Sequence, residues 1–211
     1  MVISRGAYLA VLAAVAAERG FELALSRAHA RQALSCGALE HGRGLYRAMA
    51  AFHALFLLSA AGEAFVFSAG AGGGVAVAAL GATAAAQLLR YWAVITLGRR
   101  WNTRIIVAPQ LAPVTSGPYR FVRHPNYLAV VIEMVSVPMI YGCWRTAILF
   151  SCANAVLLAM RISREEKALG ENYAAAFHKV PRFIPSLDAS MLRRLPAAIP
   201  RSGRDREKVA E

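Results

Sequence analysis

Long apolar blocks, separated by short polar segments rich in arginine, dominate the pattern of this chain. A helix that crosses a bilayer needs about 20 predominantly apolar residues. By this criterion the sequence predicts about five transmembrane helices and an all-α integral membrane protein. The predicted spans are residues 6–25, 48–67, 75–97, 127–142 and 145–160. The first span is weakened by the charged residues near its end, and the fourth is short.

The connections between these blocks are unequal. Residues 68–74 are glycine-rich and uncharged, and only Gly142, Cys143 and Trp144 separate the fourth block from the fifth. Helices joined by such short connections usually lie antiparallel beside each other. We therefore expect two helical hairpins, one from the second and third helices and one from the fourth and fifth.

The basic residues lie between the apolar blocks and in the C-terminal tail, and the net charge is +12. Membrane proteins retain lysine and arginine on the cytoplasmic side. The pattern predicts a multi-pass protein whose segments 26–47 and 98–126 and C-terminal tail are cytoplasmic. No nucleic-acid recognition motif accompanies the charge. Residues 187–211 are interpreted as a basic, disordered tail that can lie on anionic lipid.

Three charged residues remain inside the predicted spans: Glu63, Arg90 and Glu133. Such residues usually pair with each other or face a cavity. Arg90 and Glu133 each lie roughly 10 Å in from the cytoplasmic side at 1.5 Å per residue. This depth predicts either a structural ion pair or a shared role in lining a pocket. The sequence assigns no partner to Glu63.

The segment Arg123–Tyr127 is the most informative motif, because it stands where a basic loop meets an apolar block. Pro125 is compatible with the first turn of a helix, where the N–H that proline lacks would have no partner. The motif therefore predicts a helix start, with His124 just outside and Tyr127 in the first turn. Free backbone N–H groups at such a start favour a carboxylate or a phosphate.

A second polar cluster follows the fifth block, at Arg161 and Glu165–Glu166. If the helix continues, Arg161, Glu165 and Leu169 share one face by i, i+4 spacing. Because the fourth and fifth helices form a predicted hairpin, this cluster is expected to lie beside the Arg123–Tyr127 motif.

Beyond this cluster an apolar stripe is predicted to fold back over the bundle, and prolines are predicted to end it. The stripe consists of Leu169, Tyr173, Phe177 and Val180, and the prolines are Pro181 and Pro185.

Each residue of these clusters has an ordinary structural explanation. The arginines can be cytoplasmic anchors, the tyrosines interfacial aromatics and the glutamates a solvated helix face. A histidine, two tyrosines, an arginine and two carboxylates at one membrane boundary favour a functional site instead. The sequence has no nucleotide-binding glycine loop after a strand, and its three cysteines have no metal-ligand spacing, so no metal is expected.

The two clusters together resemble the isoprenylcysteine carboxyl methyltransferase (ICMT) family, with phospholipid methyltransferases as more distant relatives. The similarity covers about residues 85–186, and the N-terminal half resembles the bacterial branch. Some members of that branch O-methylate long-chain phenolic or pyrone lipids. The chain is accordingly divided into N-terminal transmembrane helices (1–84), a methyltransferase core (85–186) and the tail (187–211). The matching residues are Val114, Gly117–Tyr119, Arg123–Tyr127, Arg161, Glu165–Glu166, Leu169–Tyr173 and Val180–Pro185.

The resemblance implies S-adenosylmethionine as the methyl donor, bound at a cytoplasmic site made of loops and helix ends. By position, Arg161 would face the acceptor and act in catalysis, and His124 would act in catalysis if a phenol needs a base. The positions that would bind the cofactor are Pro113, Val114, Tyr119, His124, Pro125, Asn126, Tyr127 and Glu165.

The resulting hypothesis is a membrane O-methyltransferase that acts on a carboxylate or on a phenol or pyrone oxygen of a lipid or prenylated acceptor. One alternative is a non-enzymatic membrane scaffold that binds anionic lipid. A third is an NADPH-dependent membrane reductase, since one sterol-reductase branch has a related C-terminal region. Binding of S-adenosylhomocysteine would distinguish the first hypothesis from both others.

Overall fold

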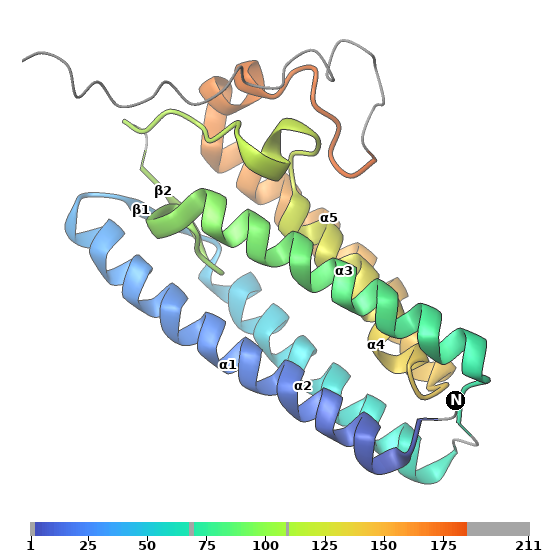
Figure 1. Cartoon of the computed structure of the whole chain (residues 1–211). Helices are drawn as coiled ribbons and strands as arrows, with labels where there is room; N and C mark the ends of the chain where they lie inside the picture. Colours follow the sequence, from blue (N-terminus) through green and yellow to red (C-terminus); the bar gives the residue numbers. More distant parts are fainter. Residues whose placement is uncertain (1–2, 68–69, 109, 185–211) are drawn as a thin grey trace, which may run out of the picture.

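The computed structural model describes residues 3–67, 70–108 and 110–184, and this part of the chain is built on five helices (Figure 1). A short two-stranded sheet and two single-turn 3-10 helices complete it. The helices are α1 (Arg5–Ser35), α2 (Arg43–Val66), α3 (Gly73–Leu97), α4 (Pro125–Met139) and α5 (Trp144–Ala176). The remaining elements are β1 (Leu39–His41), η1 (Gly98–Arg100), β2 (Ile105–Val107) and η2 (Gly117–Arg120).

Three of these helices, α2, α3 and α5, are long and apolar enough to cross a membrane. The α4 helix is apolar but only 15 residues long. The α1 helix has the length, but Glu18, Arg19 and Glu22 make its apolar stretch more polar than a typical span. It also continues ten residues past the predicted end at residue 25. The prediction of a helical integral membrane protein is confirmed.

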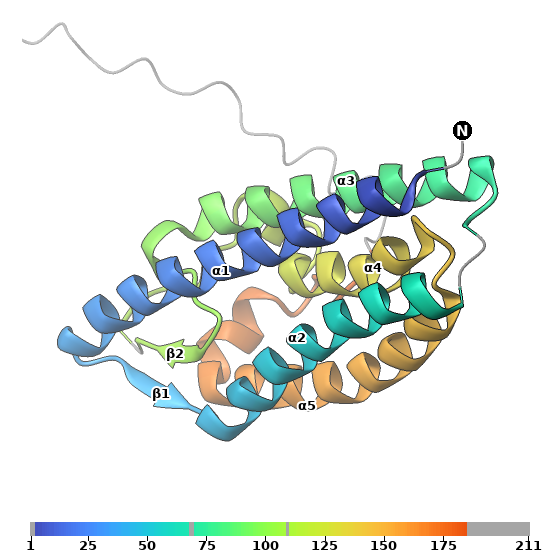
Figure 2. The same cartoon turned by 90° about the horizontal axis from the view of Figure 1, so that it is seen from below.

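The α4 helix packs between α3 and α5 (Figure 2). The predicted α4–α5 hairpin is therefore present. The α2 and α3 helices also reverse direction across a short connection, but they do not pack along each other. Instead, α2 packs against α1 and α5 while α3 packs against α4. The prediction that the second and third helices form a packed hairpin was wrong, because α4 occupies the position beside α3.

The connections at one end of the bundle touch each other. Gly142, between α4 and α5, has φ +82°, and a Cβ atom there would lie 3.2 Å from the backbone nitrogen of Ala71. At the same end, Tyr8 stacks on Tyr141 with ring centroids 5.2 Å apart, and Phe56 packs against Phe150. These four aromatic residues belong to the main apolar core of the bundle, together with aliphatic side chains of α1, α2 and α4.

Glu63 of α2 caps the start of α5. Its carboxylate accepts hydrogen bonds from the backbone N–H groups of Arg145, at 3.1 Å, and Thr146, at 2.7 Å. A negative charge there satisfies backbone donors that have no partner within the helix and interacts favourably with the helix dipole. This is the role that the sequence left unassigned.

A network of buried charges joins α1, α3 and α4. Arg90 donates to Glu133, which confirms the predicted ion pair. Arg19 also donates to Glu133, at 3.2 Å, and pairs with Glu22 at 2.5 Å. Glu18 pairs with Arg19 at 3.4 Å, so all five residues form what we call the buried charge network. The α1 charges that weaken the predicted first span thus have partners inside the bundle.

The opposite end of the bundle carries the short sheet (Figure 1). Strands β1 and β2 pair antiparallel, with Glu40 opposite Ile106. This ribbon is an addition to the predicted all-α fold.

The α5 helix is interrupted at Gly170, where φ is +72°. The predicted apolar stripe nevertheless packs back over the bundle, as expected. Its residues Leu169, Tyr173, Phe177 and Val180 contact Ala93, Leu97 and Tyr119. Pro185 and the tail 187–211 lie outside the described residues.

Candidate functional site

A cavity of about 1400 Å³ lies between the helices at the end of the bundle that carries the β-ribbon. Its wall combines side chains of α1, α2 and α3, the segment 98–114, the start of α4 and the C-terminal half of α5. Pockets for single small ligands usually measure about 300–1,000 Å³. The cavity therefore has room for two ligands at once.

The start of α4 forms one polar wall of the cavity. Pro125 is the first helical residue, as predicted, and His124 precedes it. The backbone N–H of Arg123 donates to the carbonyl of Pro181, at 2.9 Å, and that of His124 donates to Arg182, at 3.3 Å. The backbone N–H of Asn126 has no hydrogen-bond partner among the described residues. An available N–H at a helix start favours an anion.

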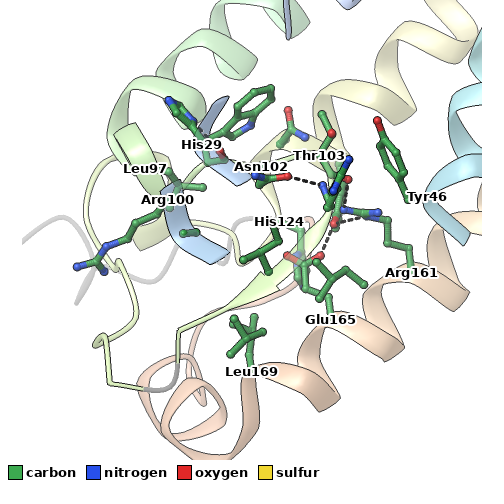
Figure 3. Close-up of a pocket in the computed structure, with 18 of the residues that line it drawn as sticks. His29, Tyr46, Leu97, Arg100, Asn102, Thr103, His124, Arg161, Glu165 and Leu169 are labelled. Carbon is green, nitrogen blue, oxygen red and sulfur yellow. Dashed lines mark hydrogen bonds between the residues drawn. The ribbon is translucent and has the colours of Figure 1, made fainter. Parts of the chain in front are cut away.

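Tyr127 connects the two polar clusters. Its hydroxyl accepts a hydrogen bond from Arg161 Nε, at 2.8 Å, and donates one to Glu165. Arg161 Nη2 also donates to the carbonyl of Thr103, at 2.7 Å (Figure 3). Arg161 is only 4% exposed. The guanidinium and the Glu165 carboxylate are therefore held in fixed positions at the cavity wall, and the predicted adjacency of the two clusters is confirmed.

The His124 ring is held from two sides. It stacks on Tyr127 with ring centroids 5.2 Å apart, and its Nε2 lies 3.0 Å from a Glu166 oxygen. Arg182 donates to the same carboxylate at 2.6 Å and 3.1 Å. The hydrogen bonds and charge of Glu166 raise the pKa of Arg182. In this arrangement Nε2 of His124 is engaged by the Glu166 carboxylate.

Segment 98–114 is anchored to the C-terminal half of α1. His29 Nδ1 lies 2.9 Å from the carbonyl of Trp101. Asn102 donates to the carbonyl of Ser26, at 3.1 Å, and the Ser26 hydroxyl returns a hydrogen bond at 2.8 Å. These contacts place Thr103 where its carbonyl meets Arg161 (Figure 3).

Every residue that the sequence predicted for the site lines this one cavity. Their roles in binding and catalysis remain predictions. Burial raises the pKa of Tyr119, so its phenol is neutral near pH 7. The predicted residues in the wall are Pro113, Val114, Tyr119, His124, Pro125, Asn126, Tyr127, Arg161 and Glu165.

Sequence reasoning missed other residues of the wall, namely His29, Tyr46, Asn102 and Thr103. No local pattern marks them, because their places depend on contacts between distant segments. Among the described residues, no group of three or more His, Cys, Asp or Glu side chains is placed to hold a metal ion.

Comparison with known proteins places this arrangement in a family. The isoprenylcysteine carboxyl methyltransferase (ICMT) family matches residues 78–171. The chain is 37% identical to the uncharacterized protein YpbQ of Bacillus subtilis, over 76% of this chain and 95% of that protein. It is 26% identical to an uncharacterized protein of Haemophilus influenzae, over 74% and 91% of the two chains.

A third relative carries a functional name. The protein-S-isoprenylcysteine O-methyltransferase of Schizosaccharomyces pombe is 32% identical over 51% of this chain and 48% of that enzyme. The family match at residues 78–171 includes both polar clusters. The chain therefore belongs to the isoprenylcysteine carboxyl methyltransferase family and is a membrane methyltransferase.

Proposed function

We propose that the protein transfers a methyl group from S-adenosylmethionine to an oxygen atom of a lipid or prenylated acceptor that enters from the bilayer. The observation that carries this proposal is the single cavity whose wall is polar at the helix ends and apolar between α1 and α2. The apolar part is lined by Ala16, Gly20, Leu23, Ala54, Leu57 and Leu58.

The polar end of the cavity suits the methyl donor, S-adenosylmethionine. S-adenosylmethionine supplies a methyl group on a positively charged sulfur. The Glu165 carboxylate favours a nearby cation, and the Asn126 N–H at the start of α4 favours the carboxylate of the donor. We assign further contacts with S-adenosylmethionine to Pro113, Val114 and Tyr119, which line the same end of the cavity.

The apolar part suits a lipid chain. Leu58 lines the cavity and is also 69% exposed, so the cavity reaches the outer surface of the bundle. In a bilayer that surface faces lipid, because α2 is one of the apolar spans. A hydrocarbon chain can therefore pass between α1 and α2 while its oxygen-bearing end meets Arg161.

Positioning is the main contribution of these residues to the reaction. Arg161 is fixed by Tyr127 and Thr103, so its charge is available to aim an acceptor oxygen without rearrangement. Orientation and exclusion of water account for much of the acceleration of such transfers. By the positive-inside rule we place this end of the bundle at the cytoplasmic face.

A transfer assay tests the proposal. The purified protein in lipid nanodiscs is incubated with methyl-labelled S-adenosylmethionine and a bacterial lipid extract, and labelled lipids are separated. We expect labelled lipid with the wild type and with Arg164→Gln, an exposed arginine of the same helix. Arg161→Gln should lose most of the label. Equal labelling by Arg161→Gln, or no labelling of any lipid by folded wild type, would contradict the proposal.

A further inference from the structure

The buried charge network is in direct contact with the start of α4. Nη1 of Arg90, on α3, donates a hydrogen bond to the side-chain oxygen Oδ1 of Asn126, at 3.2 Å. Asn126 directly follows Pro125 in α4, and both Arg90 and Asn126 line the cavity. One hydrogen bond therefore joins the network to the end of the cavity where we place S-adenosylmethionine.

Glu133 fixes the position of the Arg90 guanidinium. Arg90 donates to both oxygens of the Glu133 carboxylate, from Nε at 3.3 Å and from Nη2. Two such bonds to one carboxylate hold the plane of a guanidinium. Both side chains are buried, and Arg19 donates to the same carboxylate at 3.2 Å. Nη1 of Arg90 is therefore held in place where it meets Asn126.

The contact with Arg90 determines which way the Asn126 amide is turned. A guanidinium only donates hydrogen bonds, so the amide must present its oxygen to Arg90 and not its NH2 group. Turning the amide over would place two donors against each other. Nδ2 of Asn126 is consequently directed away from Arg90, and it has no hydrogen-bond partner among the residues that the structure describes.

Asn126 thus offers two unused hydrogen-bond donors at one point of the cavity wall. The first is its backbone N–H, which also lacks a partner in the described part of the chain. The second is the NH2 group of its side chain. Both lie in the first turn of α4, at the positive end of the helix dipole. A carboxylate has two accepting oxygens and a negative charge, so it suits this pair better than a neutral or cationic group does.

We propose that Arg90 is a positioning residue for the carboxylate of S-adenosylmethionine. It turns the Asn126 amide so that Nδ2 donates to that carboxylate beside the backbone N–H. This inference rests on the proposed function and adds to its cofactor site a residue from outside the two polar clusters. Arg90 acts through Asn126 and not on the ligand itself. Without Arg90 the amide is free to turn its oxygen toward the carboxylate, and the two would repel each other.

The Arg90–Glu133 pair also joins α3 to α4, so removing it can loosen the bundle. A second polar pair between the same two helices provides a matched control. Thr83 donates a hydrogen bond to Ser136, at 2.9 Å, and both residues are buried. Neither residue lines the cavity. A purely structural effect should therefore appear in the control as well.

Calorimetric titration with two ligands tests the inference. The ligands are S-adenosylhomocysteine and its decarboxylated form, which lacks only the carboxylate, and the protein is held in lipid nanodiscs. The test variant combines Arg90→Met with Glu133→Leu, because replacing both partners of a buried ion pair leaves neither charge without the other.

We expect wild type to bind S-adenosylhomocysteine about tenfold more tightly than the decarboxylated form. The double variant should lose about tenfold in affinity for S-adenosylhomocysteine and keep its affinity for the decarboxylated form. The control, Thr83→Val with Ser136→Ala, should bind both ligands as wild type does. An equal loss for both ligands would show that Arg90 only supports the fold, and an unchanged affinity for S-adenosylhomocysteine would show that it does not act on the site. Either result would overturn the inference.

Asn126→Asp tests the same idea with Arg90 and Glu133 left in place, so it decides the matter even if the double variant does not fold. Aspartate can still accept the hydrogen bond of Arg90, but it puts a carboxylate oxygen where Nδ2 stands. Its affinity for S-adenosylhomocysteine should fall more than about tenfold, and its affinity for the decarboxylated form should not fall. Wild-type affinity for S-adenosylhomocysteine would overturn the inference.

An Asn126→Ala background distinguishes action through Asn126 from an independent effect. In that background, adding Arg90→Met and Glu133→Leu should not weaken S-adenosylhomocysteine binding further, because the amide that Arg90 orients is already absent. Losses that add fully would overturn the inference.

The two proposals fail in different ways. If folded wild type binds neither ligand, the proposed function fails, and this inference fails with it. If wild type binds both ligands equally well, the cofactor site stands, and the contact between Asn126 and the carboxylate is wrong.

Discussion

Removing the Tyr127 hydroxyl tests the junction between the two polar clusters. Tyr127→Phe keeps the ring, its stacking on His124 and its packing against Leu158 and Ile162. It removes the acceptor of Arg161 Nε and the donor to Glu165. The change therefore isolates two hydrogen bonds at one buried position.

The magnitude follows from the burial of Arg161. With 4% exposure its Nε has little access to water. Leaving a buried donor of a charged group without a partner costs about 1–3 kcal/mol, and the hydrogen bond to Glu165 contributes roughly another 1 kcal/mol. We expect the free energy of unfolding to fall by about 2–4 kcal/mol. The methyl-transfer rate should fall about 10²-fold, because both polar side chains lose their fixed orientation.

Two measurements check this prediction: reversible unfolding in detergent and the single-turnover rate of methyl transfer. Tyr141→Phe is the control, because the Tyr141 hydroxyl has no hydrogen-bond partner in the ranges that the structure covers. It should change neither quantity by much. If Tyr127→Phe left both the unfolding free energy and the rate at wild-type values, the described hydrogen bonds would not organise the site.

Three further predictions concern the scaffold. Glu63→Ala removes the cap of α5 and should lower the free energy of unfolding in detergent by about 1–2 kcal/mol. An unchanged free energy of unfolding would show that Glu63 does not stabilise the start of α5. Arg90→Met should cost about 3–5 kcal/mol because it leaves Glu133 with less compensation, and adding Glu133→Leu should restore part of the loss. An additive double variant would show that the two side chains are not coupled. Glu166→Gln should increase protease cleavage after residue 176, because the contact with Arg182 weakens; unchanged cleavage would contradict this.

The parts of the fold that depend on local pattern could be predicted. Apolar blocks mark the helices because every backbone polar group must be satisfied within the bilayer. Pro125 marks the start of α4 because proline suits the first turn. The short connection at Gly142 brings Arg161 and Glu165 to Tyr127, since a hairpin leaves few alternatives.

The remaining features depend on contacts between distant segments. Glu63 caps α5 only because α2 packs against it, and nothing near Glu63 in the sequence indicates the distant helix start at Trp144. Arg19 weakens the apolar pattern of the first span, but in the folded bundle its side chain pairs with Glu133 of α4. The β-ribbon is only three residues long on each strand, too short for an alternating pattern to indicate it.

Calorimetric titration of S-adenosylhomocysteine into the detergent-solubilised protein tests whether the methyl donor binds at the junction of α4 and α5. We expect saturable binding to wild type and roughly tenfold weaker binding to Glu165→Ala. Arg164→Gln should bind as wild type does, because its side chain is exposed and outside the cavity. Flat titrations of folded wild type at about 1 mM ligand, or equal affinity of Glu165→Ala, would contradict a methyl-donor site at the junction of α4 and α5.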